Sequence, residues 1–418
     1  MRGNILKRIM TEKLVRWKKS GMPGVFRMCG LHGVGKSTLV LDFASKNIEN
    51  YLYIDFKTNC LANAYFNEHF NNKADFSADC LIDAVTSFYG IKRSLLRDIT
   101  VIFDSTEQVK GLSGCFDKLE PSLEKDTSAH FIEISNSRIN TENVLYPLSF
   151  EELLMNMGKT WLLEAIRGHF DTMNSMPLIL HDEIMNLFID YLHTGGMPEA
   201  VSVYLTAGMA LNLPNVLDNC CSLLSSALSD RGEKIFNSIP GQLLDNSRFE
   251  FTQLRRGAVL GDYEKEICSM SDEFIISYIR KSGQDKLLRL YYTDCGMLYS
   301  KMVSDRKLKP YGIDDKQDLD ISKILIRNML NSWFEKQSYE KNYWQSDGKA
   351  EIEFVLRKDG NRNGIPVEVT DERDRHSRKL EAYMKLNVTE KAFVLSNEPD
   401  YVKKGITIRI PYYAYFCL

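Results

Sequence analysis

Residues 30–37 read Gly30-Leu31-His32-Gly33-Val34-Gly35-Lys36-Ser37, a complete G-x-x-x-x-G-K-S phosphate loop. The preceding run 25–29 (VFRMC) has the β-branched and aromatic content of a buried strand, and the following run 37–46 (STLVLDFASK) has apolar residues at helical spacing. The motif requires this order of strand, loop and helix. All fixed positions of the motif are present, and it is flanked by a predicted strand and a predicted helix. We therefore prefer nucleotide binding to the alternative interpretation, a glycine-rich turn that binds nothing.

The residue types of the loop explain its chemistry. Glycines let the backbone form a concave nest whose N–H groups point at phosphate oxygens, and the following helix N-terminus adds its positive dipole end. Lys36 places its charge between the β and γ phosphates, the Ser37 hydroxyl is available to Mg²⁺, and Thr38 can contact the α phosphate. The expected cofactors are therefore ATP and Mg²⁺. The expected nucleotide-binding residues are Gly30, His32, Gly33, Val34, Gly35, Lys36, Ser37 and Thr38.

Length and composition indicate an ordinary globular protein of several domains. The chain has 418 residues, of which 44% are hydrophobic and 26% charged, so two to four domains are expected. A formal charge of −3 and a pI near 6.2 argue against a protein coated in nucleic-acid-binding charge. The 53 basic residues still leave room for a local basic patch.

The cysteines and the N-terminus bear on the compartment. Nine cysteines are scattered without any C-x-x-C pair, which is typical of the reduced thiols of a cytoplasmic protein. No stretch approaches 18 consecutive apolar residues, so no membrane partner is expected. The start 1–21, with apolar residues that include Ile5, Leu14 and Trp17, suits an amphipathic helix packed on the nucleotide-binding domain. A membrane-surface helix is the alternative.

Two further strands extend the predicted sheet. Residues 51–56 (YLYIDF) and 100–104 (TVIFD) alternate with helical segments, which predicts an α/β fold with a parallel sheet and helices on both faces. Such folds bind ligands at the carboxyl ends of the strands. Asp104, which ends the second of these runs, is therefore the expected Walker B aspartate that holds Mg²⁺ together with Ser37; an Asp that only caps a turn is the alternative.

The residue after Asp104 departs from the usual pattern. ATPases of this type commonly carry a Glu there to polarise the attacking water, and this chain has Ser105, which cannot act as a carboxylate base. Glu107 or Gln108 can substitute if the turn bends back toward the γ phosphate. We therefore expect slow hydrolysis, or binding alone, with Asp104 and Glu107 as the candidate catalytic residues.

A fourth strand, 130–137 (HFIEISNS), ends in small polar groups. This is the place where such enzymes keep a side chain that senses the γ phosphate, so Ser135 and Asn136 are the candidate sensors. Short polar residues at a strand end are also common turn formers, and that alternative stays open.

Four strings resemble a large group of prokaryotic AAA-like ATPases. Their order in the chain is 144–153 (VLYPLSFEEL), 191–200 (YLHTGGMPEA), 235–243 (IFNSIPGQL) and 288–298 (LRLYYTDCGML). The resemblance covers nearly the whole chain and implies an ATP-binding protein whose second domain contains a winged-helix-like module. Without the resemblance, 151–300 is mainly helical by its apolar spacing, and 195–198 (GGMP) is a tight turn.

The C-terminal region predicts a helix at 321–337 and a hairpin of strands 351–356 and 365–370. The resemblance implies a restriction-endonuclease-like core here, in which two carboxylates hold Mg²⁺ and a lysine activates the attacking water. Glu353 stands where an Asp is usual, Glu368 matches the second acid, and Thr370 replaces the lysine. Nuclease activity is therefore not expected, although Lys349 or Lys379 are candidates for a relocated lysine. The apolar tail 411–418 is expected to pack on the sheet or on a partner.

These interpretations combine into one domain plan. We expect a P-loop AAA-like ATPase domain with its N-terminal helix (1–150), a helical lid and winged-helix-like domain (151–300), a linker (301–320) and a degenerate restriction-endonuclease-like domain (321–418). The expected function is a nucleotide-dependent conformational switch with slow or absent hydrolysis.

Two alternatives stay open. The first is an ATP-regulated DNA-binding protein with an inactive nuclease-like domain, in which the basic runs 255–256 and 373–379 contact phosphates. The second is a scaffold for an unidentified protein partner that uses ATP for structural support. The candidates for an arginine finger are Arg138, Arg248, Arg255 and Arg256.

Overall fold

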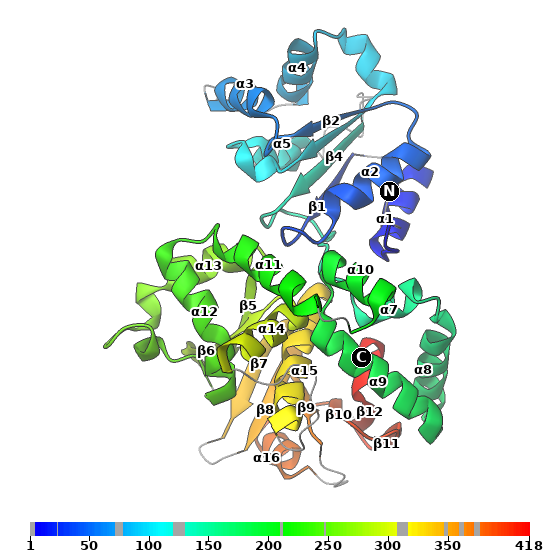
Figure 1. Ribbon diagram of the computed structural model, residues 1–418, viewed down its shortest axis with the longest axis vertical. Coiled ribbons are helices and arrows are strands. Elements are labelled where there is room, and N and C mark those ends of the chain that lie inside the picture. Colours follow the sequence, from blue (N-terminus) through cyan, green and yellow to red (C-terminus); the bar gives the residue numbers. More distant parts are fainter. Residues whose placement is uncertain are drawn as a thin grey trace. The chain divides into compact units, whose positions relative to one another are not determined.

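The computed structural model describes residues 5–22, 24–71, 78–119, 130–209, 212–245, 248–306, 317–346, 350–358, 363–371 and 377–418. The chain divides into two compact units, shown in Figure 1. Unit 1 comprises Met1–Leu145 and Asp272–Phe274, and unit 2 comprises Tyr146–Ser271 and Ile275–Leu418. The division at 145 falls close to the expected domain boundary at 150.

Unit 1 is a four-stranded parallel sheet between two groups of helices. Its elements are α1 (Met10–Lys19), β1 (Val25–Cys29), α2 (Lys36–Asn47), β2 (Tyr51–Asp55), α3 (Cys60–Asn71), α4 (Ala78–Tyr89), β3 (Thr100–Asp104), α5 (Leu112–Leu119) and β4 (His130–Ser135). The strand order is β1-β4-β3-β2, and Val144 adds an isolated parallel bridge beside Cys29. This arrangement confirms the predicted α/β P-loop fold class.

The helices cover both faces of this sheet (Figure 1). Successive strand residues point to opposite faces. Val25 of β1 belongs to an apolar cluster with residues of α3, α4 and α5, whereas Phe26 contacts Trp17 of α1 at 5.6 Å between ring centroids. Helix α1 buries Met10, Leu14 and Trp17 as its predicted amphipathic pattern requires. The helix is shorter than expected: Ile5, one of the apolar residues assigned to it, lies before its start and is 48% exposed.

Unit 2 combines a helical half with an eight-stranded mixed sheet. Its helices are α7 (Phe150–Asn156), α8 (Thr160–Thr172), α9 (Leu178–Thr194), α10 (Pro198–Ala207), α11 (Leu213–Ser225), α12 (Asp230–Asp245), α13 (Glu264–Asp272), α14 (Cys295–Arg306), α15 (Gln317–Lys336) and α16 (Arg378–Leu386). Its strands are β5 (Ile276–Lys281), β6 (Gln284–Tyr292), β7 (Glu340–Gln345), β8 (Glu351–Arg357), β9 (Ile365–Val369), β10 (Ala392–Ser396), β11 (Val402–Lys404) and β12 (Thr407–Pro411). Within the described ranges, no helix is both long enough and apolar enough to cross a membrane.

The sheet of unit 2 joins two regions that the sequence separates. Its order is β11-β12-β10-β9-β8-β7-β5-β6, so the hairpin β5–β6 extends the C-terminal strands through a parallel pairing of β5 with β7. The expected domains 151–300 and 321–418 therefore share one sheet. The expected linker 301–320 overlaps the ends of α14 and α15, and its middle part, 307–316, lies outside the described residues.

Three of the four resembling strings meet at one point inside unit 2. The Leu148 amide donates to the Gly196 carbonyl at 2.7 Å, and the Gly196 amide donates to Asp294 Oδ2 at 2.7 Å. A Cβ at Gly195 would stand 2.2 Å from Asp294 Oδ1, and one at Gly196 would stand 2.1 Å from the Leu148 carbonyl oxygen. The Gly-Gly pair is therefore required by close packing as well as by the turn.

The ends of these strings are fixed by local chemistry. Ser149 and Glu152 form a reciprocal capping box at the start of α7, which explains the S-F-E-E run. Pro198 stands at the first turn of α10, where it leaves no helical hydrogen bond unmade. The apolar tail folds back on its own unit, where Tyr415 Oη accepts from the Phe150 amide at 3.3 Å.

Candidate functional site

The phosphate loop connects the end of β1 to the start of α2. Gly35 is the residue before α2 and has φ 88°, a left-handed conformation that favours glycine. Gly30 lies so close to the chain at Leu145 that a Cβ would stand 2.1 Å from the Leu145 carbonyl oxygen. No side chain caps the first turn of α2, so its amide groups face the loop as a site for phosphate oxygens.

The side chain of Lys36 lies inside this loop. Its Nζ donates to the carbonyl oxygens of Gly30 at 2.7 Å and Leu31 at 2.8 Å, and to Asn136 Oδ1 at 2.8 Å. All three acceptors are neutral. Burial lowers the pKa of Lys36 to about 8, against the opposing effect of the nearby carboxylates of Asp104 and Glu107. The ammonium is thus held in place without a direct ion pair.

The two expected Mg²⁺ ligands lie around one phenol. Asp104 ends β3 and is 4% exposed, and its Oδ2 accepts from the Tyr53 hydroxyl at 2.7 Å. Burial, followed by the hydrogen bond to Asp104, raises the pKa of Tyr53, and Ser37 has the opposite effect on the same hydroxyl. A serine hydroxyl and a carboxylate close to the same Tyr53 hydroxyl are oxygen ligands of the kind that Mg²⁺ prefers. Tyr53 was not singled out from the sequence, although the predicted strand 51–56 contains it.

The turn after Asp104 brings Glu107 back to the site. Ser105 has φ 59°, and a short 3-10 helix, Thr106–Gln108, follows it. Glu107 Oε2 accepts from the Asn136 amide at 2.9 Å and from Ser135 Oγ at 3.2 Å, and Glu107 Oε1 accepts from Asn136 Nδ2 at 2.7 Å. Gln108, the other candidate, is exposed. The structure therefore places Glu107, Ser135 and Asn136 in one cluster.

Asn136 connects this cluster to the phosphate loop. Its side-chain oxygen accepts from Lys36, and its side-chain nitrogen donates to Glu107. The loop cation, the candidate sensor and the candidate base therefore form one continuous chain. The outer loop residues His32 and Thr38 are exposed, and His32 Nε2 lies 3.3 Å from Lys57 Nζ.

A second cation, Arg27 of β1, is buried close to the loop and was missed by the sequence analysis. Its Nε donates to Glu133 Oε2 at 2.6 Å, its Nη1 is paired with Asp117, and its Nη2 donates to the Ser113 carbonyl at 3.1 Å. Glu133 Oε1 also accepts from Thr106 Oγ1 at 3.0 Å, which ties the turn after Asp104 to this network. An arginine inside the apolar run 25–29 is the sequence signal that could have revealed it.

The residues of the expected nuclease-like centre come together on β8 and β9 of unit 2. Glu353 Oε1 accepts from Arg327 Nη2 of α15 at 2.7 Å, and its Oε2 accepts from the Val369 amide at 3.2 Å. Burial raises the pKa of Glu368, whose buried Oε2 has no hydrogen-bond partner among the described residues. Thr370 follows β9 and is buried. Arg327 was missed, because its partner lies 26 residues away on another element.

This centre does not fit a metal ion. Both carboxylate oxygens of Glu353 are already bonded, one of them to a guanidinium. Over the described ranges, no group of three or more His, Cys, Asp or Glu residues is arranged to hold a metal. Lys379 lies at the start of α16, and its charge partly offsets the rise in the pKa of Glu368. Lys349 and residues 373–376 lie outside the described residues.

The arginines considered as fingers or phosphate contacts lie on the surface. Arg138, Arg248, Arg255 and Arg256 are exposed. Arg255 is paired with Asp262 at 3.1 Å, and Arg248 with Glu250 at 2.7 Å. Arg138 lies over the Phe274 ring at 4.7 Å from its centroid.

No protein-family model matches the sequence, and no curated protein matches it either. The solved structures similar to it include the Walker-type ATPase of Pyrococcus abyssi, with 14% identity, coverage of 72% of this chain and 97% of that one, and a TM-score of 0.44. A signal transduction ATPase with a tetratricopeptide repeat sensor from Pyrococcus horikoshii has 14% identity, coverage of 80% and 45%, and a TM-score of 0.27. The Drosophila ORC bound to DNA has 12% identity, coverage of 72% and 88%, and a TM-score of 0.23. At these scores the likenesses add nothing to what the sheet order and the phosphate loop establish.

Proposed function

We propose that the protein binds ATP with Mg²⁺ at the phosphate loop and uses it as a conformational switch, with slow hydrolysis. Lys36 and the first-turn amides of α2 would hold the β and γ phosphates, and Ser37 and Asp104 would hold Mg²⁺. The bound ion supplies charge neutralisation at the phosphates. The hydrogen bond of Tyr53 to Asp104 and the effect of Ser37 on the same hydroxyl support this assignment.

The hydrogen-bonded chain Lys36–Asn136–Glu107 carries the proposal. All three described hydrogen bonds of the Lys36 ammonium go to protein oxygens, so a γ phosphate must replace at least one of them. Replacement of the bond to Asn136 frees that amide to turn toward the phosphate, and this in turn loosens Glu107. A change at the phosphate is thereby transmitted to the turn after β3.

Glu107 is the side chain placed to act as general base. Ser105 cannot accept a proton at neutral pH, and Glu107 is the carboxylate that Ser135 and Asn136 hold beside the loop. Three hydrogen bonds engage its two oxygens, so it must be released before it can polarise water. Slow turnover follows from that requirement.

The test compares Glu107→Gln with the unmodified protein. The amide side chain has nearly the same shape but cannot accept a proton, so phosphate release should fall at least about tenfold while ATP affinity changes little. Hydrogen exchange of peptides covering 104–110 and 130–140 should respond to ATP more than to ADP. Calorimetry gives the affinities, and a phosphate-release assay gives the rate.

Gln108→Ala is the matched control, because Gln108 is the exposed neighbour on the same turn. It should leave binding, exchange and phosphate release unchanged. An unmodified protein that takes up no ATP in the presence of Mg²⁺ contradicts the whole proposal. A Glu107→Gln variant that releases phosphate at the original rate contradicts the role of Glu107 alone.

We propose further that the centre on β8 and β9 is not a nuclease. The ion pair between Arg327 and Glu353 supports this, because it uses the carboxylate that a metal would need. Purified protein with Mg²⁺ or Mn²⁺ should leave DNA uncut over hours. Cleavage that is lost on Glu353→Gln would contradict this assignment.

A further inference from the structure

Two basic side chains at the outer edge of the phosphate loop have no role in the function proposed above. His32 belongs to the loop itself, and Lys57 follows β2, two residues beyond Asp55, which pairs in register with Asp104 of β3. Both side chains are exposed, and His32 Nε2 lies 3.3 Å from Lys57 Nζ. Two separate segments therefore meet at the carboxyl edge of the sheet, where Asp104 ends its strand.

The contact between these side chains fixes the protonation of the imidazole. An ammonium has three donors and no acceptor, so the His32 nitrogen that faces Lys57 must accept the hydrogen bond. His32 is therefore neutral in this state, with its proton on Nδ1. Partial burial of the ring, followed by the charges of Lys57 and Lys36, lowers the pKa of His32, and Asn136 and the Glu107 carboxylate have the opposite effect.

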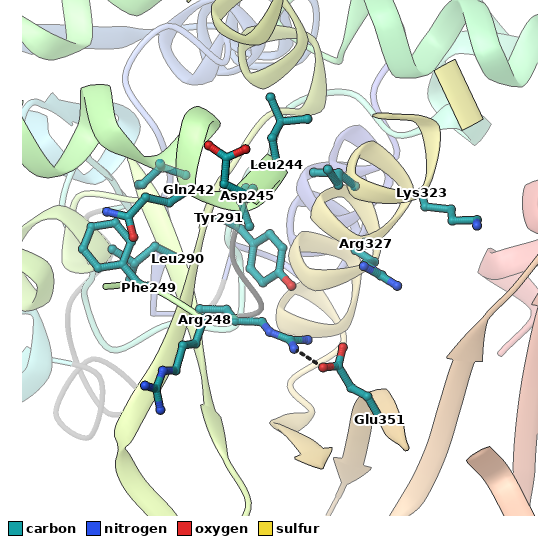
Figure 2. A pocket seen from close by; sticks show the side chains of 14 residues that line it. Gln242, Leu244, Asp245, Arg248, Phe249, Leu290, Tyr291, Lys323, Arg327 and Glu351 are labelled. Carbon is teal, nitrogen blue, oxygen red and sulfur yellow. Dashed lines mark ion pairs between the residues drawn. The ribbon is translucent and has the colours of Figure 1, made fainter. Parts of the chain in front are cut away.

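The charge of Lys57 is held by a neutral group. Over the ranges that the structure describes, the Lys57 ammonium makes no ion pair, and its side-chain hydrogen bond is to His32. The cations around the pocket of unit 2 drawn in Figure 2 are instead each paired with a carboxylate: Arg248 with Glu250, Arg289 with Glu351, Lys323 with Asp371 and Arg327 with Glu353. A cation held by a neutral imidazole can exchange that partner for an anionic ligand without leaving a carboxylate unpaired.

The two side chains border the part of the site that is proposed to hold the terminal phosphate. Asn136 and Glu107, the candidate sensor and base, both act on the His32 ring. Lys57 follows the strand that pairs with β3, beside Asp104. A terminal phosphate carries a charge of about −1.5 to −2 near neutral pH and three acceptor oxygens, which is more than the loop lysine alone can satisfy.

We infer that His32 and Lys57 contact the terminal phosphate of ATP, and that His32 takes up a proton from solvent when this phosphate enters. The inference rests on the ATP binding proposed above and adds a means of distinguishing ATP from ADP. A phosphate oxygen draws the Lys57 ammonium away from the imidazole, and a ring nitrogen that faces an anion is stabilised in its protonated form. No bond of the nucleotide breaks in this step. ADP lacks the terminal phosphate, so it causes no such uptake.

Titration calorimetry of the full chain with ATP and with ADP, in Mg²⁺ at pH 7.0, tests this inference. Buffers of different ionisation enthalpy report the number of protons taken up on binding. ATP should take up at least about 0.3 proton more than ADP, because an adjacent opposite charge moves a pKa by about 1–3 units. Lys36, whose pKa is about 8, is still charged in about nine-tenths of the molecules at this pH and adds little to the difference.

Three single variants locate the effect. His32→Gln keeps a hydrogen-bonding side chain that cannot be protonated, so the additional proton uptake with ATP should disappear. Lys57→Gln should weaken ATP binding at least about tenfold and leave ADP binding unchanged, because hydrogen bonds to charged groups are the strong ones. Lys92→Gln is the matched control, since Lys92 is an exposed lysine that precedes β3 on the amino side of the strand, and it should change neither affinity.

A spectrum of the protein with carbon-13-labelled histidine gives a readout that a structural role would not change. The chain has seven histidines, and the His32 signal is identified by its loss in His32→Gln. ATP should move this signal to the position of a protonated imidazole, and ADP should not. The inference is overturned if ATP binds with no more proton uptake than ADP, or if Lys57→Gln and Lys92→Gln bind ATP alike. If the unmodified protein binds no ATP, the proposed function fails, and this inference fails with it.

Discussion

Arg27 and Lys36 are two buried cations on either side of Gly30, and the protein treats them differently. All three nitrogens of Arg27 are bonded, to Glu133, Asp117 and the Ser113 carbonyl. Lys36 is bonded to neutral oxygens alone. Arg27 is thus neutralised within the fold, whereas Lys36 keeps a positive charge that is not directly bonded to any described carboxylate.

This difference shows how a buried cation can be assigned to structure or to ligand binding. A guanidinium enclosed by two carboxylates cannot attract an anion, and its removal leaves buried negative charge. An ammonium held by carbonyl oxygens can exchange them for phosphate oxygens at little cost. By the same criterion Arg327 is intermediate, since one of its nitrogens is paired and its Nε is not.

The largest expected effect is on stability, from Arg27→Met. Glu133 is fully buried, so the loss of its partner should cost about 3–5 kcal/mol of unfolding free energy in unit 1. Adding Glu133→Gln should recover part of that loss, because the buried charge is then gone. Thermal melting of the single and double variants measures both effects. Equal melting of Arg27→Met and the unmodified protein would show that the network is not structural.

Lys36→Ala should affect ligand binding instead of the fold. Loss of a charge-assisted contact should weaken ATP binding by about 1.5–3 kcal/mol, roughly 10- to 150-fold. Lys46→Ala is the matched control, since Lys46 is an exposed lysine on the same helix and is paired with Asp42. Titration calorimetry on the two variants distinguishes them. If both bind ATP as the unmodified protein does, the distinction between the two cations fails at this site.

The pH dependence sharpens the comparison further. Because burial lowers the pKa of Lys36 to about 8, the folded protein releases this proton between pH 8 and the ordinary value near 10.5, while the unfolded chain keeps it. The unfolded state then binds more protons, so the contribution to stability rises with pH in this window. ATP affinity moves the opposite way and should fall by up to about tenfold for each pH unit above 8. Calorimetry from pH 7 to 9.5 tests this, with Lys36→Ala expected to show no such slope.

The smallest effect is expected from Tyr53→Phe. The Tyr53 hydroxyl donates to the Asp104 oxygen that Mg²⁺ would use, so its removal should raise Mg²⁺-dependent ATP affinity by about 0.5–1.5 kcal/mol. Affinity without Mg²⁺ should not change. Tyr51→Phe, at an exposed position of the same strand, serves as control. Weaker Mg²⁺-dependent binding in Tyr53→Phe would mean that the phenol helps to hold the ion.

The sequence predicted the parts of the fold that depend on local pattern. The bounds of β1 and β3 agree with the predicted runs 25–29 and 100–104, and the hairpin of β8 and β9 formed as its alternation indicated. The joining of β5 to β7 was not predictable, because no local signal records which distant strand completes a sheet edge.

The site residues divide in the same way. Lys36, Ser37 and Asp104 belong to short motifs whose spacing carries their chemistry. Tyr53 and Arg327 belong to their sites through contacts with residues on other elements of the chain. Such pairs cannot be identified from a single sequence. Glu107 was predicted only on the condition that the turn bends back toward the site, and the left-handed conformation of Ser105 provides that bend.

The meeting of Leu148, Gly196 and Asp294 in unit 2 has an evolutionary consequence. Three stretches that are separated by tens to hundreds of residues share two hydrogen bonds and a contact with no room for a Cβ. A Cβ gained at 196 would collide with the Leu148 backbone, and one at 195 with the Asp294 carboxylate and the Gly296 amide, so a shorter side chain opposite does not make room for it. In descendants of this protein the three stretches should therefore be inherited as a set, with glycine kept at 195 and 196.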